Sequence, residues 1–196
     1  MRPFRLSFIV AAGLAVFAAC GDGSDPKYIA PEAYLPAYPG SYWDYTDGTR
    51  VRATAYELHS YRPSTTSTDY TDECYVPVWD GHYLYKYSIY QPSPLYPMKE
   101  LLRAKGGNAV WIVDESNSDK LKRSEVAIDS LAVGDSVYKD VYCVTEFIES
   151  LDNIDHWNLR EYYAKNVGLV KVEVNNPYDS LGCVVQKELR SYFINK

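Results

Sequence analysis

Residues 124–147 read SEVAIDSLAVGDSVYKDVYCVTEF, two runs of alternating apolar and polar side chains on either side of Gly134 and Asp135. Alternation with a period of two, in runs rich in valine, tyrosine and threonine, is typical of a strand with one buried face. Glycine adopts the positive φ that a tight hairpin turn requires. The stretch therefore predicts two antiparallel strands that turn at Gly134-Asp135.

The same pattern recurs along the chain. Further hairpin turns are expected at Asp-Gly 47–48, at Asp-Gly 80–81 and at Gly-Gly-Asn 106–108, although a helix over 98–104 is the alternative at the third place. The last strands lie in 160–174 and 183–194. We expect a mainly β fold with little helix: a single antiparallel, strongly curved sheet or partial barrel of roughly ten strands.

The N-terminus carries an export signal. Arg2 and Arg5 precede an apolar run, residues 6–19, that is too short to span a bilayer but has the length of a signal-peptide core. Residues 17–20, FAAC, resemble the lipobox of bacterial lipoproteins, with Phe in place of the usual Leu. The resemblance implies cleavage before Cys20 and lipidation of its thiol; the alternative is an ordinary secretory signal with a chance cysteine.

Three segments follow from this interpretation. Residues 1–19 form the signal peptide, 20–39 a lipidated Cys and a flexible, proline-rich spacer, and 40–196 a single β-rich domain. Cleavage leaves 18 Lys and Arg against 26 Asp and Glu, a formal charge of −8 instead of −6. This acidic balance argues against nucleic acid as a partner, because phosphate binding needs clustered Lys and Arg.

Two sequence blocks carry a family resemblance. YPGSYWDY at 38–45 and YYAKNVGLVKVEV at 162–174 are similar to blocks of uncharacterised Bacteroidetes lipoproteins. Asp22 and Asp25 resemble the acidic signal that directs such lipoproteins to the outer face of the outer membrane. The resemblance implies a lipid anchor in the outer membrane and surface exposure, and it implies no activity.

The cysteines leave several pairings open. Beyond Cys20 the chain has Cys74, Cys143 and Cys183, an odd number for an oxidising compartment. A cross-strand disulfide between Cys143 and Cys183 is one candidate, and Cys74 paired with either is another. Buried free thiols are the remaining interpretation.

The tyrosines supply the candidate binding residues. Tyr83, Tyr85 and Tyr87 alternate onto one face of an expected strand, and together with Trp157 they form a candidate aromatic binding surface for a glycan, a peptide or a protein. The alternative is a core rich in tyrosine.

Catalytic and metal-binding motifs are absent from the sequence. The three histidines lack zinc-site spacing, and no nucleophile elbow or phosphate-binding glycine loop occurs, so we expect no catalytic residues, metal or cofactor. The sequence thus favours a non-enzymatic, membrane-anchored lipoprotein of the cell envelope that presents a β-domain to a partner. A carrier or chaperone for an apolar molecule is the alternative, and a hydrolase comes third.

Overall fold

The computed structural model describes residues 27–28, 30–61, 64, 66, 68, 70–79, 84–86, 102–104, 109–114, 120–148, 157–175 and 182–196. Cys20 and the signal peptide lie outside these residues, as do Tyr83, Tyr87 and most of the segment for which a helix was the alternative. The described residues contain strands and no helix, so none of them forms a helix that could cross a membrane.

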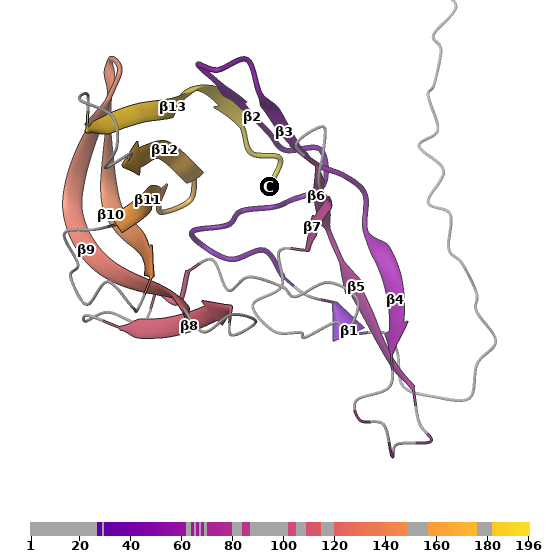
Figure 1. Cartoon of the computed structure of the whole chain (residues 1–196). Coiled ribbons are helices and arrows are strands. Elements are labelled where there is room, and N and C mark those ends of the chain that lie inside the picture. The colour runs from indigo at the N-terminus through magenta and orange to yellow at the C-terminus, as the bar shows by residue number, and fades with distance from the viewer. Residues whose placement is uncertain are drawn as a thin grey trace, which may run out of the picture.

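Thirteen strands are described (Figure 1). Their bounds are β1 Lys27–Tyr28, β2 Tyr42–Tyr45, β3 Arg50–Ala53, β4 Glu57–Tyr61, β5 Thr71–Tyr75, β6 Pro77–Trp79, β7 Leu84–Lys86, β8 Val110–Asp114, β9 Leu121–Val133, β10 Ser136–Ile148, β11 Trp157–Ala164, β12 Gly168–Asn175 and β13 Cys183–Phe193.

Ten of the strands form one antiparallel sheet in the order β7-β6-β3-β2-β13-β12-β11-β10-β9-β8. Strands β8 to β13 follow each other as a meander, after which β13 pairs with β2 from the start of the chain. Figure 1 shows β9 and β10 bending strongly around β11 and β12. The sheet ends in two separate edge strands, so the prediction of a strongly curved antiparallel sheet of about ten strands is confirmed.

At two of the predicted turns, glycine has the positive φ that a tight turn requires. Gly134 joins β9 to β10 with a φ of 55°, and Gly48 joins β2 to β3 with a φ of 86°. Strands β6 and β7 flank the predicted turn at 80–81 and pair antiparallel, while the turn itself lies outside the described residues. The turn expected at 106–108 lies outside the described residues, and the strand after it, β8, pairs with β9 at the edge of the meander.

A second sheet was not expected from the sequence. Strands β3 and β6 pair with each other, and beyond them the same two chain segments continue as the β4–β5 hairpin. Strand β1 pairs in parallel with β5 and completes a three-stranded sheet in the order β1-β5-β4. This small sheet lies at the lower right of Figure 1, apart from the curved meander.

Two clusters of buried apolar side chains hold the large sheet together. The larger cluster joins β2, β3 and β6 to β10, β11 and β12, and it includes Trp43, Tyr45 and Val170. The indole of Trp43 donates a hydrogen bond to the carbonyl oxygen of Val167, and the hydroxyl of Tyr45 donates one to that of Leu169, 3.0 Å away. Because buried polar groups need partners, these bonds let aromatic side chains fill the interior.

The glycine of the YYAKNVGLVKVEV block, Gly168, lies at an irregular point of the β11–β12 hairpin. Its φ is 101°, and the pairing of β11 with β12 shifts register between Tyr162 and Tyr163. A Cβ atom at Gly168 would lie 3.4 Å from the Trp43 indole nitrogen and 3.5 Å from Pro36. Glycine therefore provides both the left-handed backbone and the room for two neighbours to pack closely.

The predicted spacer is shorter than expected. Residues 30–39 pack against the large sheet: Leu35 and Ala37 are buried, Pro36 is fully buried, and the backbone NH of Asn166 donates a hydrogen bond to the carbonyl oxygen of Ala33. The described prolines that suggested a spacer instead lie in a segment of tight turns that covers the end of the β11–β12 hairpin. The folded domain thus begins before residue 40.

Candidate binding groove

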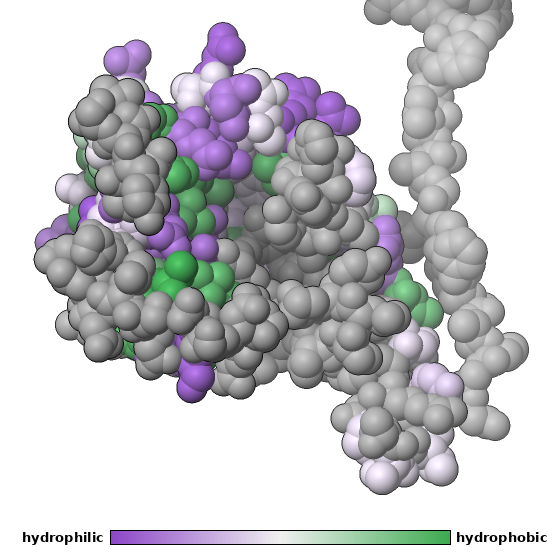
Figure 2. Space-filling view, in the orientation of Figure 1, coloured by the Kyte–Doolittle hydropathy of each residue, from purple (hydrophilic) through white to green (hydrophobic). Residues whose placement is uncertain are grey.

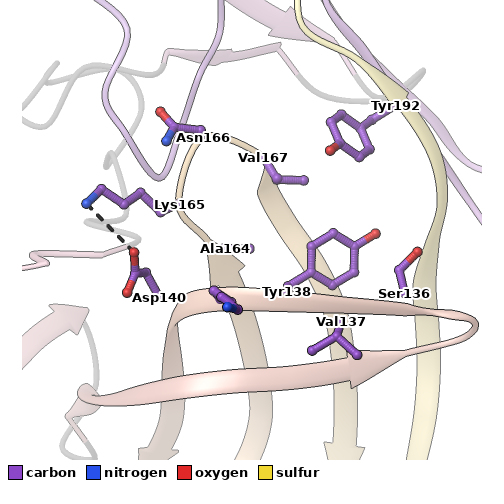
Figure 3. Close-up of a pocket in the computed structure, with 10 residues that line it drawn as sticks. Ser136, Val137, Tyr138, Asp140, Ala164, Lys165, Asn166, Val167 and Tyr192 are labelled. Carbon is purple, nitrogen blue, oxygen red and sulfur yellow. Dashed lines mark ion pairs between the residues drawn. The ribbon is translucent and has the colours of Figure 1, made fainter.

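A groove lies where the tip of the β9–β10 hairpin meets the β11–β12 turn and the end of β13 (Figure 3). Its volume is about 520 Å³, within the range of about 300–1,000 Å³ that is typical of small-ligand sites. Segments 136–140 and 164–167 line it together with Tyr192. Strand pairing joins the first two segments, and the curl of the sheet brings Tyr192 beside them.

Two tyrosines face the groove. Tyr192 on β13 is 44% exposed, and the half-buried ring of Tyr138 packs against the larger hydrophobic cluster. Figure 3 shows the two rings on adjacent sides of the groove. Burial raises the pKa of Tyr138, and the nearby Tyr192 raises it further, against a hydrogen bond with Ser136 that lowers it. The ring of Tyr138 can therefore offer an apolar face beside a hydroxyl group that stays neutral at neutral pH, and the ring of Tyr192 adds a second apolar face.

The remaining groove residues are small or polar. Ala164 and Val167 are buried, and Asn166 is exposed at the turn with a φ of 62°. The ammonium of Lys165 lies 3.8 Å from the carboxylate of Asp140, and both side chains are at least half exposed. Among the described lining residues Asp140 is the only carboxylate and Lys139 is a second cation, so the groove combines apolar rings with hydroxyl and amide groups and three charged side chains.

The predicted aromatic surface does not include Trp157. Its side chain is only 7% exposed, and the guanidinium of Arg160 lies 4.2 Å from the centre of its ring. Tyr85 lies on β7 opposite Val78, and Tyr83 and Tyr87 lie outside the described residues. Trp157 is thus a packing residue at the start of β11, which its sequence position among polar residues did not indicate.

The candidate disulfide between Cys143 and Cys183 is also wrong. Cys143 lies on β10 and Cys183 on β13, with β11 and β12 between them. Two strands lie between them, and the register places Cys143 in the row of Glu188, five residues along β13 from Cys183. A disulfide needs Cα atoms about 4.4–6.8 Å apart, closer than this arrangement allows. Cys74, Cys143 and Cys183 are all free thiols, buried, half-buried and exposed respectively.

A polar cluster surrounds Cys143 on the adjacent strands. The hydroxyl of Tyr162 donates a hydrogen bond to the carboxylate of Glu173, 2.7 Å away, and the ammonium of Lys171 lies 2.8 Å from the same carboxylate. Burial raises the pKa of Cys143. Hydrogen bonds with Thr145 and Tyr162 lower this pKa, but by less than burial raises it. The thiol therefore stays protonated and is a poor nucleophile.

Charged side chains are fully buried elsewhere in the large sheet. Arg123 is 1% exposed; its guanidinium lies 3.0 Å from the Glu146 carboxylate and 2.8 Å from that of Glu161. Burial opposes the charge, but the two carboxylates and Tyr163 together raise the pKa of Arg123. The arrangement ties β9, β10 and β11 together in the interior, and we interpret it as structural.

A second buried carboxylate holds a loop in place. One oxygen of Glu125, which is 0% exposed, accepts hydrogen bonds from the backbone NH groups of Arg103 and Ala104 at 3.0 and 2.9 Å. Ala104 has a φ of 51°, and Leu102 beside it is buried in the smaller hydrophobic cluster. Glu125 thus fixes residues 102–104 against β9.

Comparison with known proteins adds nothing to this description: no family model matches the chain, and no curated protein or solved structure is similar to it. The groove, the thiols and the buried charges are therefore interpreted from their own geometry. Within the described residues no three His, Cys, Asp or Glu side chains are placed to hold a metal ion.

Proposed function

We propose that this chain is a membrane-anchored lipoprotein of the cell envelope, located in the outer membrane, whose β-domain binds a glycan in the groove formed by Tyr138 and Tyr192. The anchor rests on the sequence of residues 17–20 and the resemblance to Bacteroidetes lipoproteins. The glycan rests on one observation: two tyrosine rings border a groove in which hydrogen-bonding side chains, both neutral and charged, lie within reach of the rings.

The chemistry of the groove suits a sugar. The apolar face of a sugar ring packs against an aromatic ring, and its hydroxyl groups need neutral donors and acceptors close by. Ser136, Asn166 and the tyrosine hydroxyls are such groups. The only described carboxylate in the groove is already paired with Lys165, so a cationic ligand would have to compete with that ion pair.

The two other functions have less support. A carrier for an apolar molecule needs a continuous apolar cavity, whereas Trp43, Tyr45 and Val170 occupy the described interior of the large sheet. A two-carboxylate glycoside hydrolase needs a pair of acids about 5–9.5 Å apart, and the described lining of the groove supplies one. Binding without chemistry is therefore the function that we propose.

A nuclear magnetic resonance titration tests the proposal. The mature domain, without lipid, is titrated with a panel of gluco-, galacto- and N-acetylglucosamine oligosaccharides and with a panel of uncharged peptides. We expect shifts for one class of oligosaccharide, centred on residues 136–140, 164–167 and 192. Shifts at these residues with peptides alone would replace the glycan by a peptide, and no shift there with either panel would contradict the groove as the site.

The anchor needs a separate test. Cells that express the full chain are labelled with radioactive palmitate and compared with cells that express Cys20→Ala. We expect label in the wild-type protein and none in the variant, because the cysteine thiol is the proposed attachment point. Equal label in both proteins, or label in neither, would refute lipidation at Cys20.

A further inference from the structure

The three-stranded sheet β1-β5-β4 carries an exposed apolar face. Tyr28 on β1 and Leu58 on β4 both pair with Cys74 of the central strand, so the three residues form one row across the sheet and share a face. Tyr56 precedes Leu58 by two residues, and its ring meets that of Tyr28 edge to face at 5.6 Å. Tyr28, Tyr56 and Leu58 therefore form a continuous patch, here called the Tyr28 face.

This face is open to solvent. Tyr28 is 64% exposed, Leu58 58% and Tyr56 43%, while the small thiol of Cys74 between them is 8% exposed. Figure 2 shows hydrophobic atoms at the surface over β4. Tyr70, which is 61% exposed, adds another ring just before β5. Scattered apolar side chains are normal on a surface, but a contiguous group on one sheet face calls for a partner.

The length of chain before β1 identifies the partner. Six residues lie between the proposed lipidated Cys20 and Lys27, the first residue of β1, so seven Cα–Cα steps join the two. A fully extended chain of that length spans at most about 25 Å. Among the described strands, β1 is thus the one nearest to the anchor along the chain, and the Tyr28 face belongs to its sheet.

We propose that the Tyr28 face rests on the membrane interface beside the lipid anchor, where it contacts the headgroup region of the bilayer. Tyrosine favours this zone because its ring is apolar and its hydroxyl is polar, and Leu58 adds an aliphatic contact. The contact needs no basic residues, which suits a mature chain of formal charge −8. This inference rests on the proposed lipid anchor.

The contact lies apart from the proposed groove. Figure 1 places the β4–β5 hairpin at the lower right and the tip of the β9–β10 hairpin, which borders the groove, at the upper left. A domain that contacts the bilayer through the Tyr28 face therefore keeps the groove apart from that contact. The lipid anchor and the interfacial patch together would hold this orientation better than the lipid anchor alone.

Fluorescence quenching by lipid tests the contact. The full lipidated chain carrying Leu58→Trp is reconstituted in phosphatidylcholine vesicles with and without brominated acyl chains. Val137→Trp is the matched control, because Val137 is 67% exposed on the distant β9–β10 hairpin. The emission of the wild-type chain is subtracted from each. We expect the added emission of Leu58→Trp to shift to the blue and to lose most of its intensity, and that of Val137→Trp to stay unchanged.

Three results would overturn the proposal, and they can be told apart. If mass spectrometry finds no acyl group on Cys20, both the anchor and the contact fail. If the acylated chain binds vesicles but brominated lipid leaves Leu58→Trp unquenched, or quenches both variants equally, the contact alone fails. If the Cys20→Ala chain forms a dimer in solution that Leu58→Asp dissociates, the face belongs to a second copy of the chain instead.

Discussion

The two sheets of this protein differ in how their least expected side chains are covered. The ten-stranded sheet buries Arg123 and Glu125 almost completely, whereas the three-stranded sheet leaves Tyr28 and Leu58 more than half exposed. In the large sheet the charges meet opposite charges or backbone NH groups, and covering segments exclude water. In the small sheet nothing described covers the apolar row. The presence of a partner, more than the polarity of the side chain, determines burial here.

The largest expected effect follows from removing a buried charge. Arg123→Met keeps most of the volume of the side chain but leaves Glu146 and Glu161 without their shared cation, so we expect a loss of about 3–5 kcal/mol in the free energy of unfolding. Urea denaturation measures it. Arg50→Met is the control: its ion pair with Asp44 is exposed, and we expect a much smaller loss. Similar losses in both variants would contradict the comparison.

A change of pH tests a second ion cluster in the large sheet. Burial raises the pKa of Glu173, but hydrogen bonds from Lys171 and Tyr162 outweigh it and hold the pKa below the ordinary 4.5. A lowered pKa stabilises the fold above pH 4.5, and this contribution disappears as the pH falls through the folded value. Glu173→Gln should therefore be less stable than wild type at pH 7 and approach it in acid.

Glu57 provides the matched control from the small sheet. Its side chain is exposed on β4, and Glu57→Gln should unfold at the same urea concentration as wild type at both pH values. If the free energies of unfolding of Glu173→Gln and wild type differ by the same amount across this pH range, ionisation of the Glu173 carboxylate does not cause the difference in stability.

The smallest effect on stability is expected on the Tyr28 face. Leu58→Ser removes an exposed side chain, so the free energy of unfolding should change by about 0.5 kcal/mol or less. The same substitution uncovers Cys74, and its thiol should react faster with a maleimide in the native protein, as followed by mass spectrometry. A large loss of stability would mean that Leu58 is a core residue, contrary to the comparison.

Sequence alternation and glycine positions predicted much of the large sheet. The hairpins at Gly134 and Gly48 are local features, set by backbone conformation at single residues. The pairing of β13 with β2 and of β3 with β6 joins segments far apart in the sequence, and no local pattern specifies it. The packing of residues 30–39 and the small sheet were missed for the same reason.

The candidate site was predicted less well than the fold. A stripe of alternating tyrosines drew attention to residues 83–87, whereas the groove takes one ring from Tyr138 and one from Tyr192, on strands that are not neighbours in sequence. The alternation in SVYKDVYCV, which placed Tyr138 on a strand, was visible in the sequence. Its proximity to Tyr192 was not, because that depends on the curl of the whole sheet. Likewise, the disulfide between Cys183 and Cys143 was a candidate because both cysteines were expected on strands. The order of the strands, which separates the two, was not visible in the sequence.

The most direct test of the proposed function compares two neighbouring rings at the end of β13. Tyr192 faces the groove, and Phe193, similarly exposed, stacks on Tyr42 at 5.9 Å. Calorimetric titration with the oligosaccharide selected from the panel should give a Kd about tenfold higher for Tyr192→Ala, roughly 1.4 kcal/mol, and an unchanged Kd for Phe193→Ala. Equal affinities for both variants and wild type would contradict the assignment of the groove as a glycan-binding site.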